Sequence, residues 1–289
     1  MRIPESELII NSDGSAFHIH MRPCDLASTV ILVGDPGRVA MFRSRLSAVK
    51  SEGASREFVW VTGSYGGKDV TVLSTGIGPD NIDIVMTELD ALANIDFETR
   101  EEKPEHRTLH ILRVGTSGAV QPDIPLGAYV FSEVSVGFDG VMNWYEGREK
   151  FAMKDFEDAF LGHINWNPNL PKPYFVRDSQ YLTDLFRDCT VPGMTISAPG
   201  FYGPQGRVVR QKLAMPDFLE KIESFSYKGK KFTNFEMEGS VIAAMGRKLG
   251  HETATVCCII ANRYNKDANV DYKPMVDSLV KLVLDRLTA

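Results

Sequence analysis

At 289 residues, with 43% hydrophobic and 24% charged side chains, the chain has the composition of a globular protein with a sizeable core. A formal net charge of −6 argues against nucleic acid or an anionic membrane as the main partner. The first residues lack the apolar core of a signal peptide, and no apolar run reaches the roughly twenty residues that cross a bilayer. We therefore expect a cytoplasmic protein.

The predicted elements alternate between strands and helices. The β-branched run 29–33 predicts a buried strand, and a helix is expected from residue 36 to about 47, with Asp35 as its N-cap. The later predicted elements are strands at 58–61 and 70–73 joined by a Gly66-Gly67 turn, a helix at 79–94, strands at 109–114 and 129–136, a helix at 234–249, a strand at 253–261 and a helix at 275–287. This alternation predicts an α/β fold built as a single domain over residues 1–289.

Two segments interrupt the alternation. Residues 95–108 are densely charged, and residues 146–173 mix aromatic side chains with Asn and Pro. Long loops are often functional, but a plain surface excursion is the better interpretation of both, and we treat them as insertions. The four cysteines have no metal-ligand spacing, and the adjacent Cys257 and Cys258 are expected in a buried strand of a reduced protein.

Three arginines stand where buried strands are predicted to end, namely Arg38, Arg113 and Arg263. An arginine beside an apolar sheet is costly unless it meets an anion. Arg38 falls in the first turn of a predicted helix, where the dipole disfavours a cation but free N–H groups favour a phosphate. These positions predict a small anionic ligand at one edge of the sheet.

Two glycine-rich segments follow predicted strands. The turn expected at 115–118, Gly-Thr-Ser-Gly, joins two hydroxyls to Arg113 and suits a phosphate. The segment 74–79, Ser-Thr-Gly-Ile-Gly-Pro, is equally well explained as a tight strand-to-helix turn. The sequence has neither the Gly-Lys-Ser/Thr of a P-loop nor a GxGxxG dinucleotide fingerprint at these places.

Two further motifs carry polar groups suited to a sugar and a base. Glu236 and Glu238 flank Met237 before a helix, and they are interpreted either as helix-capping acids or as acids that bind vicinal hydroxyls in a cleft. Gln205 and Arg207 lie in a glycine-rich loop and match a base edge with carbonyl and N–H groups. Taken alone, that loop would more often be ordinary surface.

In order along the chain, these segments resemble the nucleoside phosphorylase family, and within it the uridine phosphorylases. The resemblance extends from about residue 16 to about 285, apart from the two insertions, and no single motif decides it. Its motifs are Phe17-His18, Gly34-Asp35-Pro36-Gly37-Arg38, Ser55-Arg56-Glu57-Phe58, Ser74-Thr75-Gly76-Ile77-Gly78, Arg113-Val114-Gly115-Thr116-Ser117-Gly118, Gln205-Gly206-Arg207, Glu236-Met237-Glu238 and Asn262-Arg263. It implies a central mixed, partly barrel-like β-sheet flanked by helices.

The resemblance implies a role for each residue that matches a family motif. The phosphate-binding positions are matched by Gly34, Arg38, Arg56, Arg113 and Thr116. The ribose-binding positions are matched by His18, Glu236, Met237 and Glu238. The base-binding positions are matched by Phe201, Gln205, Arg207 and Arg263. The catalytic roles fall to Arg113, Gln205, Arg207 and Glu238. His18 and Arg56 match residues lent by a neighbouring subunit, which implies a homodimer or a trimer of dimers with shared sites.

The implied reaction is phosphorolysis of a pyrimidine nucleoside, in which uridine and phosphate give uracil and α-ribose 1-phosphate without a metal or organic cofactor. Family members can also hold a structural potassium ion, at positions that match Glu57, Ile77 and Asn81. The usual serine is Asn81 here, and Gly78-Pro79-Asp80 departs from the common Gly-Gly-Pro-Ser.

Three alternatives stay open at this point. A purine nucleoside phosphorylase of this fold typically has an Asp after the last core strand, where this chain has Ala261-Asn262-Arg263. A nucleosidase uses water and does not need the arginine cluster. A non-catalytic nucleoside-binding protein is the most remote, and a turnover assay separates it from the enzymes.

Overall fold

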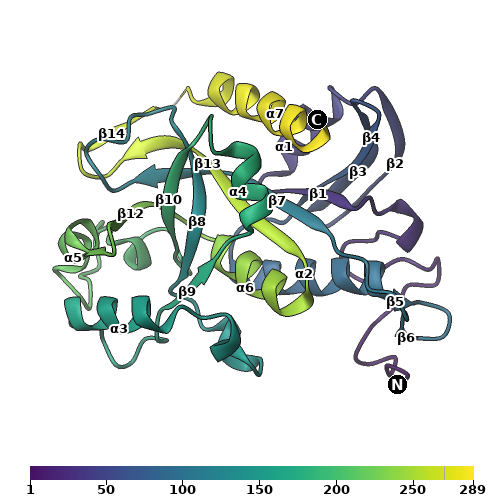
Figure 1. Cartoon of the computed structure of the whole chain (residues 1–289), viewed down its shortest axis with the longest axis horizontal. Coiled ribbons are helices and arrows are strands. Elements are labelled where there is room, and N and C mark those ends of the chain that lie inside the picture. The colour runs from purple at the N-terminus through teal and green to yellow at the C-terminus, as the bar shows by residue number, and fades with distance from the viewer. Residues whose placement is uncertain (270) are drawn as a thin grey trace.

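A mixed β-sheet forms the centre of the protein, described by the computed structural model for residues 1–269 and 271–289. Its main strand order is β11-β12-β10-β8-β13-β7-β1-β4-β3-β2, with β9 paired to β8 and β14 to β13 (Figure 1). The strands are β1 Thr29–Val33, β2 Ala48–Ser55, β3 Phe58–Tyr65, β4 Lys68–Ser74, β7 His110–Ala119, β8 Tyr129–Gly137, β9 Tyr174–Arg177, β10 Val191–Ser197, β11 Ser226–Tyr227, β12 Lys230–Glu236, β13 Glu252–Asn262 and β14 Asp267–Ala268.

One half of this sheet closes into a barrel. Strand β12 pairs with β10 on one side and with β7 on the other, through Asn234 opposite Ala119 and Phe235 opposite Gly118. The strands β7, β13, β8, β10 and β12 therefore form a closed ring. The other half, β1 to β4, extends from β7 as an open sheet. The predicted α/β class with a mixed, partly barrel-like sheet is confirmed.

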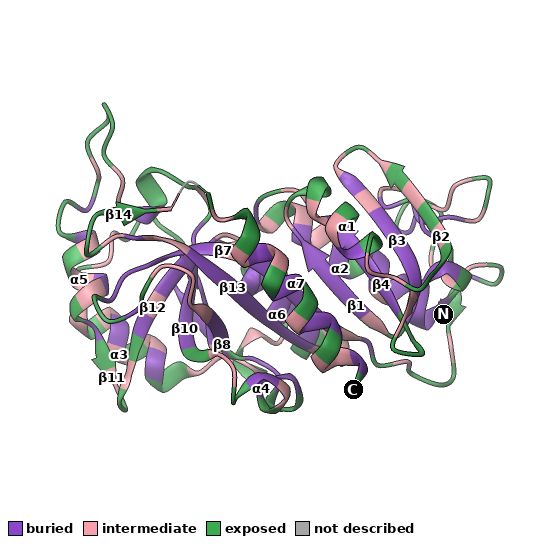
Figure 2. Ribbon diagram, turned by 90° about the horizontal axis from the view of Figure 1, so that it is seen from above, coloured by how far each residue is buried: buried purple, intermediate pink, exposed green. Residues whose placement is uncertain are grey.

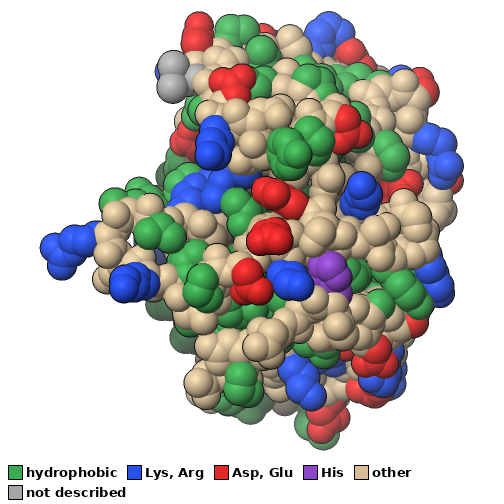
Figure 3. Space-filling view, turned by 90° about the vertical axis from the view of Figure 1, so that its left-hand side faces the viewer, with side chains coloured by type: hydrophobic (Ala, Val, Ile, Leu, Met, Phe, Trp, Pro, Cys, Tyr) green, Lys and Arg blue, Asp and Glu red, His purple; other side chains and the backbone are tan. Residues whose placement is uncertain are grey.

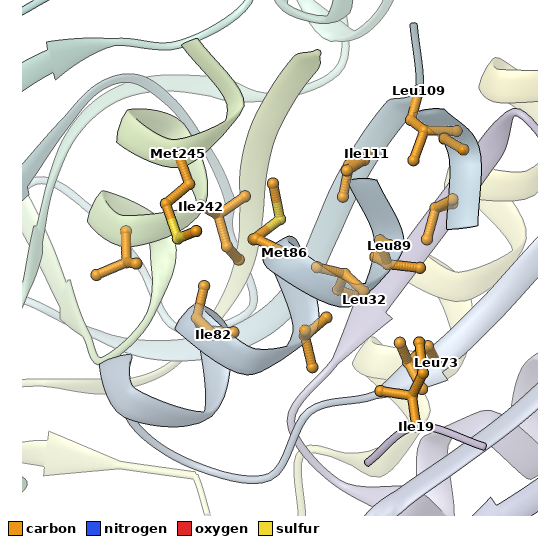
Figure 4. Packing of buried hydrophobic residues seen from close by; sticks show 14 of the residues in the cluster. Ile19, Leu32, Leu73, Ile82, Met86, Leu89, Leu109, Ile111, Ile242 and Met245 are labelled. Atoms are coloured by element: carbon orange, nitrogen blue, oxygen red, sulfur yellow. The ribbon is translucent and has the colours of Figure 1, made fainter. Parts of the chain in front are cut away.

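Helices cover both faces of the sheet. They are α1 Pro36–Arg43, α2 Pro79–Asn94, α3 Lys154–His163, α4 Gln180–Phe186, α5 Phe218–Ser224, α6 Gly239–Leu249 and α7 Lys273–Thr288. Helices α2 and α6 pack on one face, where Ile82, Met86 and Leu89 of α2 lie between α6 and β1 (Figure 4). Helices α1, α4 and α7 pack on the opposite face. The strands between these layers are buried, and the helices expose their outer sides (Figure 2).

The two predicted insertions have structure of their own. Residues 95–108 contain a short antiparallel pair, β5 Ile95–Asp96 and β6 Glu101–Glu102. Residues 146–173 contain α3, whose Phe156 and Phe160 join an aromatic cluster with α5 and β12 on the outside of the barrel. The second segment therefore covers apolar barrel surface that would otherwise face water.

Several predicted element boundaries were wrong. The helix expected from residue 234 begins at Gly239, because residues 234–236 pair with neighbouring strands as part of β12. The helix that starts at Pro36 ends at Arg43 instead of near residue 47. Strand β2 was not predicted, because as the edge strand of the open sheet it lacks a buried apolar run.

The distribution of charged side chains on the surface agrees with the composition of the chain. Acidic and basic side chains lie interspersed on the face that carries α3 and α5 (Figure 3). Among the described residues, no helix combines the length and apolar character that a membrane crossing requires.

Candidate active site

A cavity of about 500 Å³ opens where β1, β4, β7, β10, β12 and β13 end or approach their ends. It is lined by Gly34, Asp35, Pro36, Arg38, Gly76, Ile77, Arg113, Thr116, Ser117, Gly118, Phe201, Gln205, Arg207, Phe235, Glu236, Met237, Glu238, Ile260 and Ala261. The structure therefore brings together ten of the predicted site residues, which are Gly34, Arg38, Arg113, Thr116, Phe201, Gln205, Arg207, Glu236, Met237 and Glu238.

One end of the cavity holds Arg38 at the start of α1. Asp35 caps this helix by accepting the N–H of Gly37 at 2.8 Å, as the sequence predicted. The Arg38 guanidinium donates to the carbonyl of Val114 and to Oγ1 of Thr116, both at 3.3 Å. Burial, and then the neighbouring Arg113, lower the pKa of Arg38. An anion between the two guanidinium groups would relieve that repulsion.

Residues 115–118 form a strand, so the turn predicted after Arg113 was wrong. They continue β7, held by parallel pairing with β13 and by the barrel closure at Gly118. Arg113 thus lies within a buried strand, and a Cβ on Gly115 would come within 2.2 Å of its Nη1. Glycine is required at residue 115 because the arginine side chain lies against the backbone of its own strand.

Arg113 is paired with two carboxylates. Its Nη2 donates to Glu238, and its Nη1 lies 3.2 Å from Oε2 of Glu236. Burial alone would lower the pKa of Arg113, but Glu238 and Glu236 together raise it. Burial raises the pKa of Glu238, against the effect of Arg113. The fixed positive charge of Arg113 is thereby held in the wall of the cavity.

The two acids have different partners, and the helix-capping interpretation is confirmed for Glu236. Glu236 accepts the N–H groups of Glu238 and Gly239 at 2.9 Å, and thus caps α6. It also accepts the hydroxyl of Ser197, a residue that sequence reasoning missed because it belongs to β10. Glu238 accepts the N–H of Gly78 at 2.8 Å, which ties the glycine-rich turn before α2 to the cavity. Glu236 is largely committed to the protein, while Glu238 faces the cavity with fewer internal bonds.

The other end of the cavity is formed by the loop after β10. Nη1 of Arg207 donates to Oε1 of Gln205 and to the carbonyl of Phe201, both at 2.6 Å. The guanidinium of Arg207 stacks 3.8 Å from the centre of the Phe201 ring. Burial, and then Arg263, lower the pKa of Arg207 to about 10, so it stays charged at neutral pH. Arg263 lies behind the loop and donates to the carbonyl of Gln205 at 2.9 Å.

Besides Arg263, which lies behind the loop, two predicted residues do not line the cavity of their own chain. Nδ1 of His18 lies 2.6 Å from Glu88 Oε1, and Glu88 also accepts the N–H groups of His18 and Ile19. Arg56 is exposed at the tip of the β2–β3 hairpin, with a left-handed φ of 54°. His18 is thus anchored by Glu88, and the exposed Arg56 likewise lies outside the cavity.

The positions that match a potassium site do not fit that ion. Nδ2 of Asn81 donates to Oε1 of Glu57 at 3.1 Å and to the carbonyl of Thr75 at 2.8 Å. An amide N–H group is a hydrogen-bond donor and does not bind a cation, and here both N–H groups point at the oxygens that a cation would use. The Asn81 amide thus bridges the two groups within one chain.

A second group of possible metal ligands lies near the start of β7. Ligand atoms of Asp90, His106 and His251 lie within 4.8 Å of one another. However, the N–H of Leu109 donates to Nδ1 of His251 at 3.2 Å, so the neutral ring carries its proton on Nε2, which lies 3.1 Å from Asp90. A metal on Nε2 would require the proton on Nδ1, facing the Leu109 N–H. This donor set therefore does not fit a metal ion.

Comparison with known proteins agrees with this geometry. Residues 28–286 match the family profile described as the phosphorylase superfamily. The chain belongs to this superfamily. The chain is 29% identical to the uridine phosphorylase of Thermococcus kodakarensis, over 88% of its own length and 80% of that protein. It is 28% identical to the uridine phosphorylase of Escherichia coli, over 95% of this chain and 97% of that protein.

A solved structure confirms the fold. The chain superposes with a TM-score of 0.89 on the Trypanosoma brucei nucleoside phosphorylase, whose structure is described as showing uridine phosphorylase activity. The two chains are 27% identical, and the match covers 97% of this chain and 99% of the other. The resemblance drawn from ordered motifs is thereby confirmed at the level of family and fold.

Proposed function

We propose that this phosphorylase cleaves uridine with phosphate to give uracil and α-ribose 1-phosphate, a pentosyl transfer without a metal or organic cofactor. The observation that supports it best is the order of groups along one cavity. Arg38, Arg113 and Thr116 lie at one end, Glu238 lies next to Arg113, and Gln205 with Arg207 lies at the other end. An anion, a sugar and a base each meet groups suited to them.

The phosphate end would bind and orient the nucleophile. Arg38 and Arg113 supply guanidinium forks, and Thr116 supplies a hydroxyl that already bonds Arg38. A phosphate held there attacks C1′ while the bond from C1′ to the base nitrogen lengthens. The sugar then gains oxocarbenium-like charge, which the phosphate dianion stabilises electrostatically. Arg113 serves both substrates, because it also holds Glu238 beside the sugar.

The base end would stabilise the leaving group. As the glycosidic bond breaks, its electron pair passes to the pyrimidine ring, and negative charge spreads to the carbonyl oxygens. Arg207 is charged and rigidly held by Gln205 and Phe201, so it can donate to that developing charge without rearranging. Gln205 offers a further donor and acceptor for the base edge.

The groups of this site are less suited to a purine substrate. Asn262, at the end of β13, donates to the carbonyls of Gln121 and Ile124, both at 2.9 Å. It is therefore a buried structural amide, and it has no acidic proton to give to a purine. A nucleosidase would not need Arg38 and Arg113 at the nucleophile end of the cavity.

The decisive experiment is a nucleoside panel incubated with and without phosphate, with free base measured by chromatography. We expect uracil release from uridine to depend strictly on phosphate and to exceed base release from inosine. Equal release in phosphate-free buffer would instead identify a hydrolase. Faster turnover of inosine would identify a purine enzyme.

The proposal includes a two-fold dimer with shared active sites. It is supported by His18 and Arg56, which match ligand-binding positions of the family but lie outside their own cavity. Each would complete the site of the partner subunit. The proposal further places the protein in the cytoplasm and treats the chain as one domain with insertions at 95–108 and 146–173.

Subunit complementation tests the shared site. His18→Ala and Arg113→Ala are each expected to be nearly inactive. Unfolded and refolded together, about half of the dimers are mixed, and each mixed dimer has one site with every wild-type group, so about a quarter of wild-type activity should return. Confirmed mixed dimers without any recovery would mean that His18 does not serve the partner.

A further inference from the structure

Ser197, the last residue of β10, lies directly beside Glu236, the last residue of β12. The two residues are paired in register across these parallel strands, and their exposures are only 2% and 3%. Among the residues that the structure describes, Glu236 lines the active-site cavity and Ser197 does not. Ser197 is therefore not placed to touch a ligand, and any effect on the site must pass through its neighbours.

The hydroxyl of Ser197 can donate in one direction only. Its oxygen accepts the backbone N–H of Ser240, in the first turn of α6, at 2.8 Å, and this group is always a donor. Its other hydrogen bond among the described residues joins Oε1 of Glu236, and an ionised carboxylate is always an acceptor. The proton of Ser197 is therefore fixed on Glu236.

Three donors set the orientation of the Glu236 carboxylate. Oε1 accepts the Ser197 hydroxyl and the N–H of Gly239 at 3.0 Å. Oε2 accepts the N–H of Glu238 at 2.9 Å. The ion-pair contact with Arg113 is made by Oε2, which lies 3.2 Å from Nη1. Because Ser197 holds Oε1, the carboxylate cannot turn both of its oxygens toward Arg113.

The guanidinium of Arg113 consequently keeps part of its donor capacity free. It carries five N–H groups, of which Nη2 donates to Glu238, while Nε has no hydrogen-bond partner among the described residues. An arginine and a carboxylate that can turn freely form a bidentate pair, which occupies two N–H groups. A Glu236 released from Ser197 would compete in this way for the donors that an anion in the cavity needs.

We propose that Ser197 is a positioning residue for phosphate binding, because it prevents Glu236 from forming a bidentate pair with Arg113 and so leaves N–H groups of Arg113 free for the phosphate. This inference rests on the proposed function, since it takes the anion of the cavity to be phosphate. The same hydrogen bond offsets part of the negative charge of Glu236, which would otherwise repel the phosphate more strongly.

The first test removes the hydroxyl. Ser197→Ala should raise the KM for phosphate by about 5- to 20-fold, a part of the value of one hydrogen bond to a charged group, and should change the KM for uridine clearly less. Thr62→Ala, which removes a buried hydroxyl of the open sheet, is the matched control and should change neither constant. Both variants should lose some melting temperature, so the split between the two KM values is the informative measurement.

The second test asks whether Ser197 acts through Glu236. Glu236→Gln keeps the shape of the side chain, but the amide has no charge and offers only one oxygen to Arg113. Loss of the Ser197 hydroxyl in this background should therefore raise the KM for phosphate less than about twofold. Phosphate binding measured by calorimetry gives the same comparison for a variant whose turnover is slow.

The outcomes separate this inference from the proposed function. A wild-type protein whose uracil release does not depend on phosphate refutes the proposed function. With a phosphate-dependent wild type, an unchanged KM for phosphate in Ser197→Ala, or an equal rise in both KM values, overturns the positioning role. A full rise in the Glu236→Gln background overturns it as well, because Ser197 would then act by another route. Should Ser197→Ala not fold, Ser197→Cys keeps the size of the side chain, donates only weakly and replaces it in both tests.

Discussion

The two ends of the cavity are built in different ways. The end proposed for phosphate consists of strand ends and the first turn of α1, where Arg113 is buried and paired with Glu236 and Glu238. The base end depends on the loop after β10, where Phe201 remains 51% exposed. In the proposed function, the sheet would bind the reactive anion, while the part of the substrate that varies among nucleosides would meet a loop that can change without disturbing the core.

The largest effect is expected from Arg113→Ala at the rigid end. It removes a phosphate ligand and leaves Glu236 and Glu238 buried without their cation. Loss of one partner of a buried ion pair typically costs about 3–5 kcal/mol. We expect a large drop in kcat/KM together with a clear fall in the melting temperature, measured by steady-state kinetics and calorimetry. A variant of unchanged stability would show that the acids do not depend on Arg113.

A smaller effect, confined to catalysis, is expected at the loop end. Gln205→Ala or Arg207→Ala should cost about 2–4 kcal/mol of transition-state binding for uridine, since each removes a partly charged hydrogen bond to the base. The KM for phosphate and the melting temperature should change little, because the loop is not part of the core. A comparable loss of phosphate affinity would mean that the two ends are not independent.

The stacking of Arg207 on Phe201 gives a finer test of the same loop. Phe201→Leu keeps an apolar side chain but removes the ring beneath the guanidinium. A cation–π contact at such a partly exposed position contributes about 0.5–1 kcal/mol. We therefore expect only a two- to fivefold decrease in kcat/KM for uridine, and Phe201→Tyr, which keeps the ring, serves as the control. A loss as large as that of Arg207→Ala would indicate that the ring itself binds the base.

The smallest expected effect concerns the buried acid Asp139 beneath α6. Burial raises its pKa above the ordinary value of 3.8, despite hydrogen bonds from Tyr174 and Ser240. A raised pKa means that folding favours the protonated acid. Its contribution to the stability of the fold is therefore complete below pH 3.8 and is lost as pH rises through the folded-state pKa. Relative to wild type, Asp139→Asn should therefore gain melting temperature with rising pH, by on the order of 2 °C. A pH-independent difference would contradict this assignment.

Local signals predicted some of the elements around the cavity but missed others. The Asp35 cap, the strand β1 and the helix α2 follow from patterns of a few adjacent residues, and all three were confirmed. The strand character of residues 115–118 and 234–236 was missed, because it comes from pairing between segments more than a hundred residues apart. The bond from Ser197 to Glu236 depends on the same long-range pairing and was likewise invisible in the sequence.

The function of individual residues was predictable only where a motif carried it. Ten predicted residues meet in the cavity, because the order of motifs identified the family. The amide of Asn81 could be recognised in the sequence as a departure from the usual serine, but its bonds to Glu57 and Thr75 could not. The buried hydrogen bonds that join Ser132, Thr195, Asn234 and Ser117 had no sequence signal at all, since these are common polar residues in four separate strands.

The barrel closes through a narrow seam. Strands β7 and β12 share only the pairs at Asn234 and Phe235, whereas β7 and β13 pair along most of their length. Gly118 and Phe235, which face each other across this seam, both line the cavity. Local opening of the barrel should therefore begin there, and a nucleoside bound across the seam should hold it shut. Hydrogen exchange of the β12 amides would then slow when substrate binds, so that the weakest part of the barrel reports directly on occupancy of the site.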